Sequence, residues 1–203
     1  VYTAWDLGYS DDTAIWWFQV VRGELRILDY HSSNGKPVAY YTGLIQSKQQ
    51  ENNYTYRTHW LPHDARAKTL ASGGKSIIEQ ISNKIPLESL KIVPSLSLQD
   101  GIQASRLALM RAWFDAEKCE DGIECLRQYQ REFDEDKKVF RDKPRHDWTS
   151  HGADAFRMLA IAWSEEHKEV ARDKPITGLH VGQTDVTLNE MWQQAPKRTN
   201  GRI

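Results

Sequence analysis

Three aspartates stand at positions where a folded chain normally places apolar side chains. Asp6 ends an apolar and aromatic run at the start of the chain, and Asp64 closely follows a second such run. Asp154 interrupts an apolar, helix-like run over residues 153–163, and His151 lies three residues before it, on the same side of that helix. A carboxylate in such surroundings costs several kcal/mol if it is buried and unpaired. Each of these aspartates should therefore have a cation, a metal ion or water beside it.

The chemistry that these acids favour is metal-assisted hydrolysis. Asp6 and Asp64 fall at predicted strand ends, where open α/β sheets bind ligands, and Asp154 falls at the start of a packed helix. If the three converge, their repulsion calls for divalent cations, and oxygen-only ligation favours Mg²⁺ or Mn²⁺ over zinc. Two such ions about 3.5–4 Å apart can activate a water and stabilise the leaving oxygen of a phosphodiester. Acids at sheet ends also occur in phosphatases and kinases. Asp154 alone has an ordinary alternative role at the positive end of a helix dipole.

The elements that must position these residues follow from hydrophobic pattern and turn residues. The pattern predicts an α/β fold with a mixed sheet and helices on both faces, because three antiparallel strands are followed by alternating helices and strands. The expected strands cover residues 1–6, 13–21, 25–30, 56–61 and 90–94, with a hairpin at 131–141. Helices are expected from about residue 37, over 74–83, 99–118 and 123–129, and from about residue 150. The last of these helices should be buried and capped by Asp147, Thr149 or Ser150.

Three short motifs carry a resemblance to a known family. Ala-Trp-Asp-Leu-Gly around Asp6, Leu-Pro-His-Asp-Ala around Asp64 and Ser-His-Gly-Ala-Asp-Ala-Phe-Arg around Asp154 resemble the acidic motifs of the nuclease domain of tailed-bacteriophage terminase large subunits. The motifs occur in the family's order over about residues 1–165. The resemblance implies a ribonuclease-H-like fold and metal-dependent endonucleolytic cutting of concatemeric viral double-stranded DNA during genome packaging into procapsids.

The resemblance also implies roles and partners. It makes Asp6, Asp64 and Asp154 the ligands of two Mg²⁺ or Mn²⁺ ions. Further candidates for a ligand, a water-positioning group or a proton carrier are Asp12, Asp147 and His151. Expected partners are an ATPase motor domain of the same full-length protein, a small terminase subunit and the portal, in the host-cell cytoplasm and transiently at the procapsid. Because the chain opens inside a predicted strand without Met, we expect an excised domain, with the nuclease over 1–168 and a flexible polar tail over 169–203.

DNA binding has to come from local charge, because the net charge of the chain is -1. The predicted hairpin and the residues after it hold a basic strip, which we define as Lys137, Lys138, Arg141, Lys143 and Arg145. Arg66 and Lys68, just after Asp64, are further candidates for phosphate contacts. Charged runs are also common on solvated surfaces that bind nothing. The alternative interpretation of the basic strip is therefore a solvated surface without a ligand.

Several functions are excluded or left as alternatives. No apolar run is long enough to cross a membrane. Cys119 and Cys125 lack a second Cys/His pair at zinc-ribbon spacing, so both are expected to be reduced thiols. Two alternatives to a DNA endonuclease stay open. One is a binding module of the same fold that docks the motor, the portal or DNA without cutting; the other is a different ribonuclease-H-like enzyme, such as a resolvase or an RNA-cutting hydrolase.

Overall fold

The computed structural model describes residues 1–8, 11–68 and 73–173, with the backbone alone for 166–173. The chain divides into two units, Val1–Glu169 and Val170–Ile203. The tail expected at 169–203 lies almost wholly outside the described residues, so it stays a prediction. None of the described helices is long and apolar enough to cross a bilayer.

A six-stranded mixed sheet has the strand order β5-β4-β1-β2-β3-β6. Its three sequential strands, β1 (Tyr2–Asp6), β2 (Thr13–Val21) and β3 (Glu24–Ser33), are antiparallel neighbours, as predicted. The other strands pair in parallel: β4 (Thr58–Leu61) with β1, and β5 (Leu90–Ile92) with β4. Since β1 and β4 run side by side in one direction, the residues that follow them meet at the same edge of the sheet.

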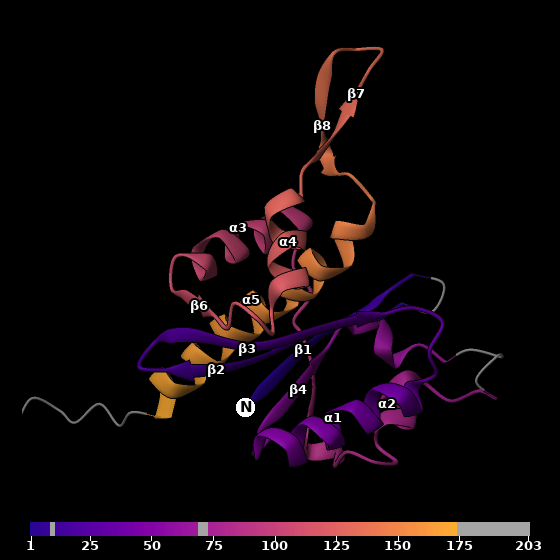
Figure 1. Cartoon of the computed structure of the whole chain (residues 1–203), viewed down its shortest axis with the longest axis vertical. Helices are drawn as coiled ribbons and strands as arrows, with labels where there is room; N and C mark the ends of the chain where they lie inside the picture. Colours follow the sequence, from indigo (N-terminus) through magenta and orange to yellow (C-terminus); the bar gives the residue numbers. More distant parts are fainter. Residues whose placement is uncertain (9–10, 69–72, 174–203) are drawn as a thin grey trace, which may run out of the picture. The chain divides into compact units, whose positions relative to one another are not determined.

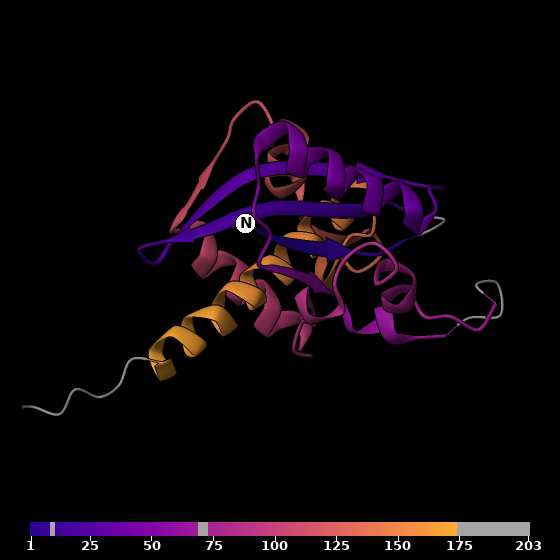
Figure 2. The same cartoon turned by 90° about the horizontal axis from the view of Figure 1, so that it is seen from below.

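Helices cover both faces of this sheet (Figures 1 and 2). One face carries α1 (Val38–Asn52) and α2 (Ile77–Ile81), with the short 3₁₀ turns His63–Arg66 and Leu87–Ser89 in the same part of the chain. The other face carries α3 (Leu98–Leu109), α4 (Glu120–Gln128) and α5 (Trp148–Asp173). The predicted α/β architecture with helices on both faces is confirmed.

The central strand β2 divides the core into two layers. Trp16 and Phe18 pack with the α5 side of the sheet, while Ile15 and Trp17 pack with the α1 side. All four side chains are fully buried, which a strand covered on both faces requires.

The first turns of α5 are fixed tightly against the sheet. The indole Nε1 of Trp16 donates a hydrogen bond of 2.9 Å to the carbonyl oxygen of Gly152. A Cβ at Gly152 would lie 2.8 Å from the Cβ of Cys125, so the helix approaches this closely only because the residue is glycine. Phe156 and Leu159, further along α5, are fully buried. The direction of the Asp154 side chain is therefore set by well-packed neighbours.

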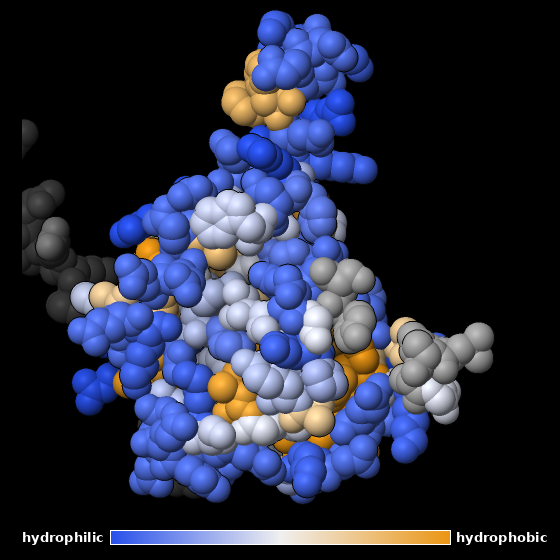
Figure 3. Space-filling model, turned by 45° about the vertical axis from the view of Figure 1, so that its right-hand side comes forward, coloured by the Kyte–Doolittle hydropathy of each residue, from blue (hydrophilic) through white to orange (hydrophobic). Residues whose placement is uncertain are grey.

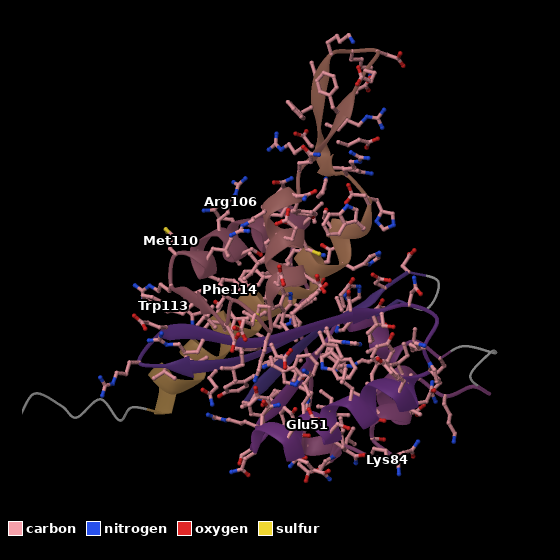
Figure 4. All side chains as sticks on the ribbon, viewed as in Figure 1. Glu51, Lys84, Arg106, Met110, Trp113 and Phe114 are labelled. Atoms are coloured by element: carbon pink, nitrogen blue, oxygen red, sulfur yellow. The ribbon has the colours of Figure 1, made fainter. Side chains whose placement is uncertain are left out.

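The helix predicted over 99–118 is wrong in its second half. α3 ends at Leu109, and Ala112–Phe114 forms β6, which pairs in parallel with β3. The edge of β3 accounts for the change: the backbone N–H of Leu25 donates to Arg111, and that of Asp115 donates to Ile27. A helix would leave these edge groups unpaired. Met110 and Trp113, two apolar residues of the predicted helix, are 75% and 59% exposed (Figure 4).

The predicted hairpin is confirmed as β7 (Arg131–Asp134) and β8 (Val139–Pro144). Its turn is held by the Asp134 carboxylate, which accepts backbone hydrogen bonds from Asp136 and Lys137. The rings of Phe133 and Phe140 meet edge-on at 5.1 Å and join the two strands. Both rings are more than a third exposed, and Figure 3 shows an apolar patch on this otherwise hydrophilic projection.

A buried histidine joins β1 to β4. Trp5 Nε1 donates to Thr3 Oγ1 at 2.7 Å, and Thr3 Oγ1 lies 2.7 Å from Nδ1 of His59. Burial lowers the pKa of His59 to about 4.

This histidine should make the fold sensitive to acid. The unfolded chain binds a proton at its ordinary pKa of 6.5, whereas the native state resists protonation down to about pH 4. The free energy of unfolding should therefore fall by roughly 3 kcal/mol between these two values as the pH drops. Denaturant unfolding at a series of pH values measures it. His59→Asn should lack this component, and the exposed control His63→Asn should keep it. An identical pH dependence in His59→Asn and the wild type would contradict the account.

Candidate functional site

Asp6 is placed at the sheet edge by a closed loop between β1 and β2. Thr13 Oγ1 accepts from the backbone N–H of Gly8 at 3.0 Å and donates to the Gly8 carbonyl oxygen at 2.6 Å. A Cβ on Gly8 would lie 2.7 Å from the carbonyl oxygen of Asp11, so only glycine fits this turn. The loop therefore brings Asp11 and Asp12 back to the end of β1, beside Asp6.

The half-buried Asp154 carboxyl lies at the same edge, from α5. Burial raises its pKa most, Arg157 lowers it, and the Asp6 carboxylate raises it further. Arg157 donates to Asp154 Oδ1 through Nε at 3.2 Å and through Nη2 at 3.0 Å. The Arg157 stem is itself fixed against Gly101, where a Cβ would lie 2.7 Å from Arg157 Cδ. We call Asp6 and Asp154 the acidic pair.

His151 connects α5 to the end of β1. Its Nδ1 lies 3.5 Å from Asp6 Oδ2, and the ring is half-buried. The contact with Asp6 raises the pKa of His151 most, and Asp12 and Asp11 raise it further. The loop acids therefore lie close enough to act on this ring electrostatically. His151 and the acidic pair, predicted from widely separated motifs, are brought together.

The acidic pair has the donor set of a hard divalent cation. Arg157 engages only Oδ1 of Asp154, and His151 engages only Oδ2 of Asp6. Within the described part of the chain, no hydrogen bond or ion pair reaches the second oxygen of either carboxylate. Two carboxylates that act on each other electrostatically, with an open oxygen each, fit Mg²⁺ or Mn²⁺, which take oxygen ligands and would offset their repulsion.

Asp64 lies at the same edge of the sheet as Asp6, because β4 runs parallel to β1. It follows β4 in the 3₁₀ turn His63–Arg66, and its side chain is exposed. It lines a groove of about 640 Å³ together with Gly8, Thr13, Lys36 and Lys75. Among the described residues, no hydrogen bond or ion pair joins Asp64 to Asp6 or Asp154. Its coordination of a shared ion stays a prediction.

Asp147 has a structural role at the start of α5. Its Oδ1 accepts from the backbone N–H of Thr149 at 2.9 Å and from the Thr149 hydroxyl at 2.6 Å, while Arg145 Nε lies 3.3 Å from Oδ2. The hydrogen bonds from Thr149 lower the pKa of Asp147 most. Asp147 is thus the cap that the sequence suggested, and its role as a metal ligand stays a prediction.

Much of the basic strip is neutralised by neighbouring acids. Arg141 lies 3.1 Å from Asp134 and 3.3 Å from Glu132, and Lys138 lies 3.2 Å from Glu135. Arg145 pairs with Asp147, and Lys68 lies 3.6 Å from Glu79. In the ranges that the structure describes, no ion pair engages Lys137, Lys143 or Arg66. These three have the charge most readily offered to a phosphate.

Sequence reasoning missed three residues near the acidic pair. His146 and Asp11 offer ligand atoms that, with one of His151, all lie within 4.8 Å of one another. Tyr129, just beyond α4, has its pKa raised to about 12 by burial first and by Asp154 second. The spacing of His146 and His151 across the start of a helix was a usable signal. Nothing in the sequence connects Tyr129 with Asp154.

The strand order and the helices on both faces define a ribonuclease-H-like fold, as predicted, with Asp6 at the end of β1, Asp64 just after β4 and Asp154 on α5. No family model and no curated protein matches the chain. Solved structures do match. The large terminase of the thermophilic bacteriophage D6E has a TM-score of 0.57 at 16% identity, over 79% of this chain and 39% of that chain. The same protein is also known in complex with ADP.

Isolated nuclease domains match over most of their length. The g2p (large terminase) nuclease domain of bacteriophage SPP1, with bound Mn, has a TM-score of 0.56 at 10% identity, over 81% of this chain and 85% of that chain. The P22 large terminase nuclease domain has a TM-score of 0.53 at 17% identity, over 79% of both chains. The chain thus has the fold of large-terminase nuclease domains and spans about two fifths of the D6E large terminase.

Titration tests the closeness of the acidic pair. In metal-free buffer, the Asp154 carboxyl should titrate above its ordinary value of 3.8, and Asp6→Asn should lower its pKa, because the neighbouring negative charge is removed. Carboxyl ¹³C NMR across a pH series measures both. The control Glu51→Gln removes an exposed acid near the C-terminal end of α1 (Figure 4) and should leave the pKa of Asp154 unchanged. A pKa of Asp154 that is the same in Asp6→Asn would show that the two carboxylates do not interact.

Proposed function

We propose that this chain is a metal-dependent endonuclease that cuts double-stranded DNA. One observation carries the proposal: a half-buried Asp154 stands beside Asp6, each with an open carboxylate oxygen, at the edge of a sheet with the terminase-nuclease fold. The Mn bound to the SPP1 nuclease domain supports divalent metal use in this fold. Mg²⁺ or Mn²⁺, in a two-ion arrangement that includes Asp64, is the cofactor that we propose.

The residues of the site have separate tasks in this mechanism. Bound ions would supply positive charge that lowers the pKa of a water and stabilises the leaving oxygen of the phosphodiester. Asp6 and Asp154 would hold these ions, and Arg157 fixes the orientation of the Asp154 carboxylate through Oδ1. His151, held through Nδ1 by Asp6, is a further candidate for a ligand, a water-positioning group or a proton carrier.

The biological substrate that we propose is concatemeric viral DNA, cut as genomes are packaged into procapsids. The fold shared with large terminases supports this substrate. Most of the D6E protein lies outside the match, which supports a longer protein that contains this domain. The ADP complex of that protein supports an ATPase motor in a longer chain that contains this domain. A small terminase subunit and the portal are the further partners, in the host cytoplasm at the procapsid.

Plasmid cutting tests the proposed activity. The wild-type chain should convert supercoiled plasmid to open and linear forms with Mg²⁺ or Mn²⁺, and EDTA should stop the reaction. Asp6→Asn and Asp154→Asn should each slow cutting by at least about a hundredfold, because loss of a ligand removes several kcal/mol of charge stabilisation. Glu51→Gln is the matched control and should cut normally. Equal rates in wild type and Asp154→Asn, or DNA binding without any cutting, would favour the binding-module alternative.

The role of Asp64 needs its own measurement, because its side chain is exposed and, among the described residues, no hydrogen bond or ion pair joins it to the acidic pair. If Asp64 completes the metal site, Asp64→Asn should abolish cutting while leaving the thermal unfolding midpoint unchanged or higher. Normal cutting by Asp64→Asn in Mn²⁺ would exclude it as a ligand and leave the acidic pair as the metal centre.

Salt dependence of binding tests the DNA path. Lys137→Ala and Lys143→Ala should each weaken binding to all DNA sequences alike and reduce the log–log salt slope by up to ~0.9, the contribution of one phosphate contact. Lys138→Ala and Arg141→Ala should have smaller effects, since their charges are already paired with Glu135 and Asp134. Lys84→Ala, an exposed lysine after α2 (Figure 4), is the control. Titrations in metal-free buffer avoid cutting. An unchanged slope in Lys137→Ala and Lys143→Ala would move the DNA path to Arg66 and Lys68.

A further inference from the structure

Two histidines and an aspartate form a separate cluster beside the acidic pair. Ligand atoms of Asp11, His146 and His151 all lie within 4.8 Å of one another. Asp11 belongs to the loop after β1, while the histidines flank the start of α5 with ring centroids 5.6 Å apart. Asp11 and His146 are exposed and His151 is half-buried, so an ion can reach all three from solvent.

The hydrogen bonds of the two rings leave the same nitrogen of each ring open. The Ser150 hydroxyl donates to the carbonyl oxygen of Asp147 at 2.6 Å, so at its 3.2 Å contact with His146 it accepts from Nδ1–H. Nε2 of His146 then carries the lone pair. Nδ1 of His151 faces Asp6 Oδ2 at 3.5 Å, which likewise directs the Nδ1 proton to the carboxylate. Within the described residues, no hydrogen bond or ion pair engages Nε2 of either ring.

This arrangement is the one that metal-binding histidines use. A ligating imidazole typically holds its other ring nitrogen on a carboxylate, carbonyl or other polar group, which fixes the tautomer and the ring direction. Here Asp6 and Ser150 provide those contacts. The ligand atoms differ from those of the acidic pair, because two imidazole nitrogens join one carboxylate oxygen. Such a mixed set suits Zn²⁺, Co²⁺ or another borderline divalent ion, whereas Mg²⁺ prefers oxygen alone.

We infer that Asp11, His146 and His151 form a second metal site, distinct from the acidic pair, which takes a borderline divalent ion such as Zn²⁺ or Co²⁺. With three protein ligands, the ion keeps a position open to solvent or substrate. The inference does not rest on DNA cutting, because it follows from the cluster alone.

Cobalt binding in excess Mg²⁺ tests the inference. Mg²⁺ occupies oxygen-only sites, and CoCl₂ is then titrated into the full chain by calorimetry and visible absorption. The wild type should bind one Co²⁺ with the absorption of nitrogen ligation. His146→Asn and Asp11→Asn should each weaken Co²⁺ binding by at least about tenfold. Loss of a group that only orients a metal ligand already lowers metal affinity by that factor, and these variants remove a ligand itself. ZnCl₂ should displace the bound Co²⁺.

Two controls separate this site from the others. His31→Asn removes a histidine that contacts Tyr40 at 3.2 Å, and Asp154→Asn removes a member of the acidic pair; both should keep Co²⁺ binding. Thermal unfolding of each metal-free variant verifies that it is folded. Co²⁺ binding that is equal in wild type, His146→Asn and Asp11→Asn would overturn the inference, as would binding lost only in Asp154→Asn. Because the readout is cobalt bound and not DNA cut, a failed nuclease assay would leave this result intact.

Discussion

The constraint on which the site depends is the placement of one partly desolvated carboxylate beside another. Asp154 belongs to a helix that the Trp16–Gly152 hydrogen bond and the missing side chain of Gly152 hold tightly against the sheet. The helix therefore cannot move away to relieve the repulsion that Asp6 exerts on this carboxyl. Arg157 compensates one oxygen only. A divalent cation, which we propose binds here, would offset the remaining repulsion between the two carboxylates.

The sheet topology brings the other residues of the site to the same place as these two carboxylates. Parallel pairing of β1 and β4 brings the residues after both strands to one edge, and the Gly8–Thr13 contacts turn the intervening loop back over it. The start of α5 reaches the same edge with His151, so acids and imidazoles from three chain segments share a small volume. The hairpin of β7 and β8 directly precedes α5 in the chain and offers Lys137 and Lys143, which no ion pair engages in the part of the chain that the structure describes. The acidic and imidazole side chains thus come from the end of β1, the loop after it and α5, whereas Lys137 and Lys143 come from the hairpin.

Local pattern was sufficient where neighbours in the sequence decide the structure. The three antiparallel strands, the hairpin and Asp147 as a cap candidate follow from alternation, turn residues and capping preference, and the structure contains them. It failed at residues 112–114, because an edge of β3, far away in the sequence, recruits them into the sheet. It also missed Asp11 and Tyr129, which reach the site through loop closure and packing. The exposed position of Asp64 within a short 3₁₀ turn is likewise a tertiary property.

A crystal of the chain soaked in Mn²⁺ tests the central claim most directly, by the anomalous scattering of the metal. The account predicts a manganese peak between the Asp6 and Asp154 carboxylates, within coordination distance of the oxygen that Arg157 and His151 leave open on each. A peak at this position that disappears in Asp154→Asn would establish that the pair shares a cation. Manganese bound only elsewhere on the chain, with both carboxylates free of metal, would contradict the account.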